Sequence, residues 1–127
     1  MNSVWIVDDD ASIRWVLEKA LSRENISCEL FSSVDDVLAA LEEEEPNVLV
    51  SDIRMPGDSG LVLLEKIKLQ YPQLPVIIMT AFSDLDSAVS SFQKGAFDYL
   101  PKPFDIASAV ELINRVMGEH TKSDSKK

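Results

Sequence analysis

Acidic, hydroxyl and basic side chains follow the hydrophobic runs of this sequence. Aspartates occupy positions 8–10 after the run VWIV, and Asp52 follows NVLVS. Thr80 ends the run PVIIMT, and Lys102 stands just beyond FDYL. Neighbouring carboxylates repel one another, and their hard oxygen atoms suit Mg²⁺, which relieves that repulsion. A hydroxyl and an ammonium group beside them favour phosphoryl transfer, with an aspartate as the nucleophile.

Each of these residues also has an ordinary structural explanation. Asp10 is equally well explained as the N-cap of a helix that follows it, and Thr80 alone as a capping or core residue. Lys102 alone would be a surface lysine, and Tyr99 alone a half-buried residue of an edge strand. Their combination at the ends of separate runs is what favours one site over independent structural roles.

The hydrophobic runs follow two patterns. Residues 4–7, 47–51 and 75–80 are almost continuously hydrophobic, which is typical of central parallel strands covered on both faces. Residues 27–31 and 97–100 alternate between hydrophobic and polar side chains, which suits edge strands. In such sheets, binding sites form beyond the carboxyl ends of the strands.

Helical stripes of hydrophobic residues separate the predicted strands. The stripes cover residues 13–21, 34–41, 61–67, 85–92 and 106–113. Gly95 is suited to end the fourth stripe as a C-terminal cap. Alternating strands and helices predict an α/β fold with a doubly wound, five-stranded parallel sheet in the order 2-1-3-4-5. This order places Asp52 at the end of the central strand, between the acids at 8–10 and Thr80.

The fourth helical stripe is narrow, whereas the first is denser. Serines at positions 87, 90 and 91 interrupt it, and serine costs roughly 0.5 kcal/mol relative to alanine in a helix. A helix held by so few hydrophobic contacts is the element expected to move when the protein changes state.

The composition excludes several classes of protein. The chain has 127 residues, 46% hydrophobic and 27% charged, which fits one globular domain. A net charge of −10 argues against direct binding of nucleic acid and is compatible with a bound cation. No run reaches the roughly 18 hydrophobic residues that span a bilayer, and the N-terminus resembles no signal peptide. We therefore expect a cytoplasmic protein without membrane association.

Cysteine and histidine contribute little to the predicted chemistry. Cys28 is the only cysteine, so an internal disulfide is excluded, which is consistent with a reducing compartment. His120 is the only histidine and lies in the polar segment HTKSDSKK. We expect Cys28 to be a structural residue and residues 119–127 to be a linker or a point of truncation after a domain at 1–118.

Four segments carry a family resemblance: IVDDD, SDIRMPGDSG, VIIMTA and YLPKPF. In their order and spacing, the chain resembles the receiver domain of bacterial two-component response regulators over about residues 3–118. SIRWVLEKAL and GAFDYLPKPFDI are most similar to receivers of the nitrogen-regulatory group. The resemblance implies a flavodoxin-like, three-layer sandwich, in agreement with the predicted topology.

The resemblance also implies roles for the acidic residues. Asp52 would accept a phosphoryl group from a phosphohistidine of a sensor histidine kinase. Mg²⁺ would be held by Asp9, Asp52 and the backbone carbonyl of Arg54, with Asp8 acting through water. The chain would catalyse only its own phosphorylation and dephosphorylation, so it would not be an enzyme for other substrates.

Further roles follow from the same resemblance. Thr80 would bond one phosphoryl oxygen and Lys102 another, and Tyr99 matches an aromatic position that turns inward on activation. The Lys102–Pro103 peptide bond is typically cis in the family. Thr80 and Tyr99 would thus form the switch that reports phosphorylation.

Relatives of this type are parts of longer transcription regulators. They carry an ATPase domain and a helix-turn-helix DNA-binding domain, and activation is expected to involve a homodimer. This chain contains no G-x-x-x-x-G-K-[ST] segment. It is therefore expected to be an isolated receiver or a part of a longer protein, and the polar tail favours the second.

Three positions depart from the relatives in the family. Phe82 stands where they often have histidine, which would alter the surface beside Thr80. Asp58 and Ser59 lie in a variable part of the turn after Asp52. None of the three belongs to the predicted phosphorylation machinery.

Other classes explain the sequence less completely. A phosphatase of the haloacid dehalogenase type would use D-x-D-x-[TV] after the first strand, but Ser12 replaces the last residue and the segment around Asp52 stays unexplained. A flavin-binding module needs a glycine- or hydroxyl-rich phosphate loop, which three aspartates would oppose. A purely structural interaction module gives no reason for acids at the strand ends.

Overall fold

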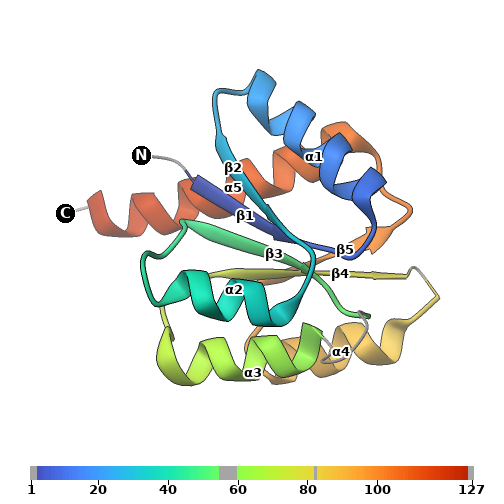
Figure 1. The fold of residues 1–127 in the computed structure, drawn as a ribbon, viewed down its shortest axis with the longest axis vertical. Coiled ribbons are helices and arrows are strands. Elements are labelled where there is room, and N and C mark those ends of the chain that lie inside the picture. The colour runs from blue at the N-terminus through green and yellow to red at the C-terminus, as the bar shows by residue number, and fades with distance from the viewer. Residues whose placement is uncertain (1–2, 55–59, 82, 126–127) are drawn as a thin grey trace.

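The protein forms one parallel sheet between two layers of helices (Figure 1). The computed structural model describes residues 3–54, 60–81 and 83–125. The strands are β1 (Ser3–Val7), β2 (Ser27–Phe31), β3 (Val48–Asp52), β4 (Val76–Ala81) and β5 (Asp98–Lys102). The helices are α1 (Ala11–Arg23), α2 (Val34–Leu41), α3 (Gly60–Gln70), α4 (Leu85–Gln93) and α5 (Ile106–Ser125).

The strand order is β2-β1-β3-β4-β5, and every neighbouring pair is parallel. The predicted doubly wound sheet with the order 2-1-3-4-5 is therefore confirmed. Each predicted strand and helix is present, with small shifts of its bounds except at the end of α5, which extends to Ser125. Strand β3 lies in the middle with all of its residues buried, whereas β2 lies at an edge and is only partly buried.

Two hydrophobic cores lie on opposite faces of the sheet. Val4 and Ile6 of β1 pack in the core beneath α1 and α5, while Trp5 and Val7 pack in the core beneath α2 and α3. This alternation follows from the two-residue period of a strand. Because both faces are covered, the polar residues of the central strands are confined to the strand ends.

The ends of two helices follow the local sequence signals. Asp10 is the N-cap of α1, and its side chain accepts a hydrogen bond from Ser12 N at 2.9 Å. The structural explanation of Asp10 is thus supported. Gly95 follows the last residues of α4 with φ 108°, a conformation that favours glycine.

Helix α5 continues to Ser125, into the polar segment after residue 118. Once a helix has formed, each further residue adds one hydrogen bond, so a polar segment can extend a packed helix. The backbone alone does not separate a domain from a linker, and the boundary after residue 118 stays a prediction.

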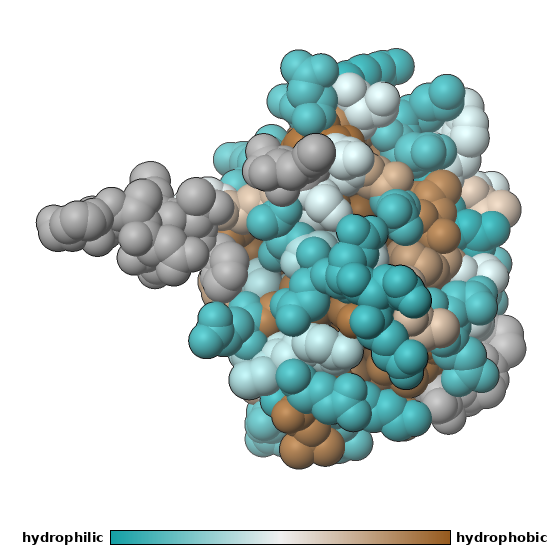
Figure 2. Space-filling view, turned by 60° about the vertical axis from the view of Figure 1, so that its left-hand side comes forward, coloured by the Kyte–Doolittle hydropathy of each residue, from teal (hydrophilic) through white to brown (hydrophobic). Residues whose placement is uncertain are grey.

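One face of the molecule is mainly polar. Figure 2 brings the side with the two termini forward, and hydrophobic residues form only small, separate areas among hydrophilic ones. This agrees with the net charge of −10. Among the helices described, none has both the length and the hydrophobicity needed to cross a membrane.

Cys28 lies partly buried on β2. Burial, together with the charges of Glu18 and Glu29, raises the pKa of its thiol to about 12. The reactive thiolate is therefore scarce at neutral pH.

We expect iodoacetamide to alkylate Cys28 at pH 8 at least about 100-fold more slowly in the folded protein than in urea. Equal rates in the two states, measured by mass spectrometry, would contradict the assignment of Cys28 as an inert structural residue.

Gly60 begins α3 close against the backbone of β3. Its N–H donates to Ile53 O at 2.8 Å, and an added Cβ would lie 2.8 Å from Ile53 Cα and also overlap Asp52 O.

We expect Gly60→Ala to lower the free energy of unfolding by about 1–3 kcal/mol, the usual cost of overpacking. Gly118→Ala is the matched control, because nothing lies within 4 Å of its added Cβ. It should stabilise α5 by about 0.5–1 kcal/mol, and urea unfolding of both variants checks the opposite signs.

Candidate functional site

Three carboxylates meet at the carboxyl edge of the sheet. One carboxylate oxygen from each of Asp8, Asp9 and Asp52 lies within 4.8 Å of the other two. Asp8 is 0% exposed and Asp52 is 9% exposed, whereas Asp9 is exposed to solvent. The cluster is thus closed toward the core and open toward solvent on the side of Asp9.

The sheet topology explains why these acids meet. Strands β1 and β3 are parallel neighbours, with Val7 opposite Ser51. The next residue of each strand is an aspartate, so Asp8 and Asp52 end side by side. Asp10 N donates to Asp8 Oδ1 at 2.9 Å, which holds the chain in a turn after β1.

Lys102 brings a positive charge to the cluster from β5. Its Nζ donates to Asp8 Oδ2 at 3.0 Å and lies 3.4 Å from Asp52 Oδ2. Strand β4 separates β5 from β3, so the long lysine side chain must reach across the end of β4. The Lys102–Pro103 peptide bond is cis, as the family resemblance implied.

The charges of the cluster shift two pKa values in the same direction. Burial and the nearby charge of Asp8 raise the pKa of Asp52, while Lys102 and the backbone N–H of Arg54 oppose the rise. Burial lowers the pKa of Lys102, but the hydrogen bond and charge of Asp8 and the charge of Asp52 outweigh it and raise that pKa. Lys102 therefore stays protonated, and one ammonium group faces three carboxylates.

This set of ligands fits a divalent cation. Carboxylate oxygens are the ligands that Mg²⁺ prefers, and a partly open site leaves room for water and phosphate oxygens. Lys102 balances only one of three negative charges, so charge balance also favours a bound cation. The predicted ligation by the Arg54 carbonyl and the water-mediated role of Asp8 stay predictions.

Thr80 and Tyr99 lie next to α4 rather than among the carboxylates. Thr80 is 1% exposed, and its Oγ1 donates to Asp84 O at the start of α4, at 3.5 Å. The ring of Tyr99 packs edge-on against Phe92 of α4, with centroids 5.7 Å apart. These positions are suitable for residues that pass a change at the site on to α4.

Sequence analysis missed three contributors to the site. Arg14 Nη1 donates to Asp8 O at 2.6 Å, and Arg54 Nη2 donates to Asp84 Oδ2 at 2.9 Å. The side chain of Asp84 also caps α4 by accepting from Ser87 N. An aspartate before a hydrophobic stripe is a recognisable cap signal, but neither arginine contact has a local sequence signal.

Phe82, Asp58 and Ser59, the positions that depart from the relatives, lie outside the described residues.

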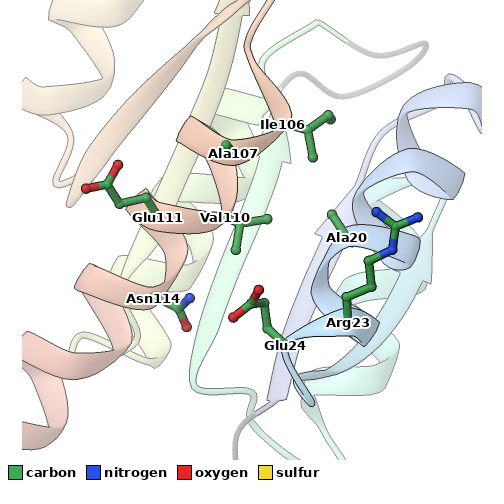
Figure 3. Close-up of a pocket in the computed structure, with 8 residues that line it drawn as sticks. All are labelled: Ala20, Arg23, Glu24, Ile106, Ala107, Val110, Glu111 and Asn114. Atoms are coloured by element: carbon green, nitrogen blue, oxygen red, sulfur yellow. The ribbon is translucent and has the colours of Figure 1, made fainter.

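A hollow separate from the carboxylates lies between α1 and α5, where Ile106 and Val110 face Ala20 (Figure 3). Mixed charges border this hollow, and none of its lining residues belongs to the acidic cluster.

The fold and the acidic cluster define a class of protein. Residues 4–114 match the family model of the response regulator receiver domain, and the chain belongs to this family. This membership confirms the family resemblance and excludes the three alternative classes, which were a phosphatase, a flavin-binding module and a purely structural module.

Several relatives with high identity are NtrC proteins. The chain is 61% identical over 117 residues to the DNA-binding transcriptional regulator NtrC of Salmonella typhimurium, which is 92% of this chain and 25% of that protein. The chain thus spans about a quarter of the length of this curated relative.

Two solved structures represent different states of one relative. The apo receiver domain of nitrogen regulatory protein C matches with a TM-score of 0.86 and 59% identity, over 94% of this chain and 97% of that one. The BeF₃-activated form matches with a TM-score of 0.80 and 59% identity, over 94% and 98% of the chains.

Repulsion inside the acidic cluster should limit the stability of the metal-free protein. Asp52→Asn removes one desolvated charge beside Asp8 and leaves the contact between Lys102 and Asp8 in place. We expect the variant to be more stable than wild type in EDTA at pH 7 by about 1 kcal/mol, a usual size for one substitution. Asp35→Asn, at an exposed position of α2, is the control and should change stability by less than about 0.5 kcal/mol. A loss of stability in Asp52→Asn, measured by urea unfolding, would contradict the expectation.

Proposed function

We propose that this chain is a phosphorylation-activated switch in which Asp52 accepts a phosphoryl group in a Mg²⁺-dependent reaction. One observation carries the proposal: the carboxylate of Asp52 lies beside those of Asp8 and Asp9, with Lys102 Nζ at 3.4 Å. An aspartate is a known nucleophile toward phosphoryl groups. In such reactions positioning and charge neutralisation supply most of the catalysis.

The residues of the cluster would divide the work. Asp9, Asp52 and the backbone carbonyl of Arg54 would hold Mg²⁺, and Asp8 would act on it through water. When bound, Mg²⁺ supplies positive charge next to the transferred group. Asp52 would attack through a carboxylate oxygen. Lys102, already 3.0 Å from Asp8 and 3.4 Å from Asp52, would pair with a phosphoryl oxygen and offset its charge.

Thr80 and Tyr99 would report the phosphorylated state. Thr80 would turn its hydroxyl from Asp84 O toward a phosphoryl oxygen, and Tyr99 would move from its contact with Phe92 into the space released. That a relative has been solved in apo and BeF₃-activated forms supports two states of this domain. Phosphorylation needs to favour one of them by only a few kcal/mol.

The remaining parts of the proposal concern partners. A sensor histidine kinase would be the phosphodonor, and the chain would catalyse only its own phosphorylation and dephosphorylation. The name of the relative, a DNA-binding transcriptional regulator, supports control of transcription in nitrogen regulation through ATPase and DNA-binding domains outside this chain. We place the protein in the cytoplasm, without contact of this domain with nucleic acid, and expect a homodimer on activation.

Incubation with acetyl phosphate and Mg²⁺ tests the reaction without a kinase. Intact-mass spectrometry should show one added phosphoryl group on wild type, removable by hydroxylamine, and none on Asp52→Asn. Asp9→Asn should slow labelling at least about tenfold by weakening the metal site. Asp10→Asn, next to Asp9 in the chain, is the control. Asparagine caps a helix as well as aspartate does, so this variant should be labelled like wild type. Phosphate mapped to Ser51 or Thr80 would refute the assignment.

A further inference from the structure

Asp84 receives contacts from two parts of the site at once. Its Oδ2 accepts from Arg54 Nη2 at 2.9 Å, and its backbone oxygen accepts from Thr80 Oγ1 at 3.5 Å. Its Oδ1 accepts from Ser87 N at 3.3 Å and so caps α4. The first residue before α4 is therefore fixed by β3 and β4 together.

Arg54 lies between the phosphoacceptor and the start of α4. It follows Asp52 by two residues, its backbone N–H opposes the rise of the Asp52 pKa, and its guanidinium group forms an ion pair with Asp84, the N-cap of α4. A phosphoryl group on Asp52 would be bonded to one of its carboxylate oxygens and would change the charge and the acceptor atoms beside the Arg54 backbone. A shift of the Arg54 backbone then acts directly on the ion pair with Asp84.

Helix α4 is weakly held along its length, so contacts at its ends matter. Val89 and Phe92 are 49% and 45% exposed, whereas Ala88 and Ser91 are buried. At the far end, Lys94 forms an ion pair with Glu65 of α3. The two ion pairs hold opposite ends of one loosely packed helix.

We propose that Arg54 is a positioning residue whose guanidinium group holds Asp84, and thereby the start of α4, in the unphosphorylated arrangement. The inference rests on the proposed function and assigns a role to the Arg54 side chain, which is separate from the predicted metal ligation by its carbonyl. Phosphorylation of Asp52 releases the ion pair, and α4 then loses one of its restraints.

The expected effect is modest and measurable. The side chain of Arg54 is 76% exposed and that of Asp84 15% exposed, and exposed ion pairs shift an equilibrium by about 1.5- to 5-fold. A shift of this size changes the population of a loosely held helix without unfolding the domain. It therefore calls for a measurement on α4 itself.

Amide hydrogen exchange of α4 in the unphosphorylated protein is the first test. Arg54→Met removes the charge but keeps the backbone N–H and carbonyl, and should speed exchange at residues 85–93 about 1.5- to 5-fold. Arg54→Lys restores a cation and should recover part of the protection. Lys94→Met, the matched control, should leave the first turn of α4 unchanged, and α1 should exchange equally in all variants. Wild-type protection of α4 in Arg54→Met would overturn the proposal.

The same variants after acetyl phosphate and Mg²⁺ provide the second test. Once Asp52 is phosphorylated, wild type and Arg54→Met should exchange alike at α4, because the ion pair is already released. A difference that persists undiminished would overturn the link to phosphorylation. Intact mass reports phosphorylation separately, so a wild type that fails to label would refute the proposed function, while the first test still decides whether Arg54 positions α4.

Discussion

The structure depends on keeping two desolvated carboxylates, Asp8 and Asp52, side by side at the end of the sheet. Burial opposes the ionised form of Asp52 and raises its pKa, and the nearby charge of Asp8 adds to that effect. Lys102 offsets part of it by reaching both acids from β5. The sheet must therefore be rigid enough to hold charges in place that would otherwise move apart, and the two hydrophobic cores on its faces supply that rigidity.

The parts predicted from the sequence are those that strand geometry dictates. Continuous hydrophobic runs occur only where a strand is covered on both faces, so residues 4–7, 47–51 and 75–80 identified the central strands. Neighbouring parallel strands end at one edge, which brings Asp8 and Asp52 together without any detail of side-chain conformation. Asp10 could be anticipated as an N-cap in the same way, because capping is a local property.

Contacts made by long side chains or by packing between distant elements could not be predicted. Arg54 reaches Asp84 thirty positions along the chain. The sequence did predict Lys102 beside the carboxylates, but not that its Nζ bonds Asp8 from across the end of β4. Tyr99 faces Phe92 in a geometry that only the packed α4 defines. In each case the sequence shows the residue type, but the residue that it contacts depends on side-chain rotamers and on the packed position of a helix. The same holds for Thr80, whose hydroxyl contacts the start of α4.

Under the proposed function, the contrast between a rigid site and a loosely held helix would allow the domain to signal. Asp52 lies on β3, which is buried throughout, and Thr80 lies on β4, which is buried except at Ala81. A phosphoryl group on Asp52 would therefore not be accommodated by moving either strand. The strain would then be relieved where the restoring contacts are weakest, which is α4 with its exposed Val89 and Phe92. A charge change at one strand end would thus become a displacement at the surface, because close-packed cores rearrange most readily at their least stable element.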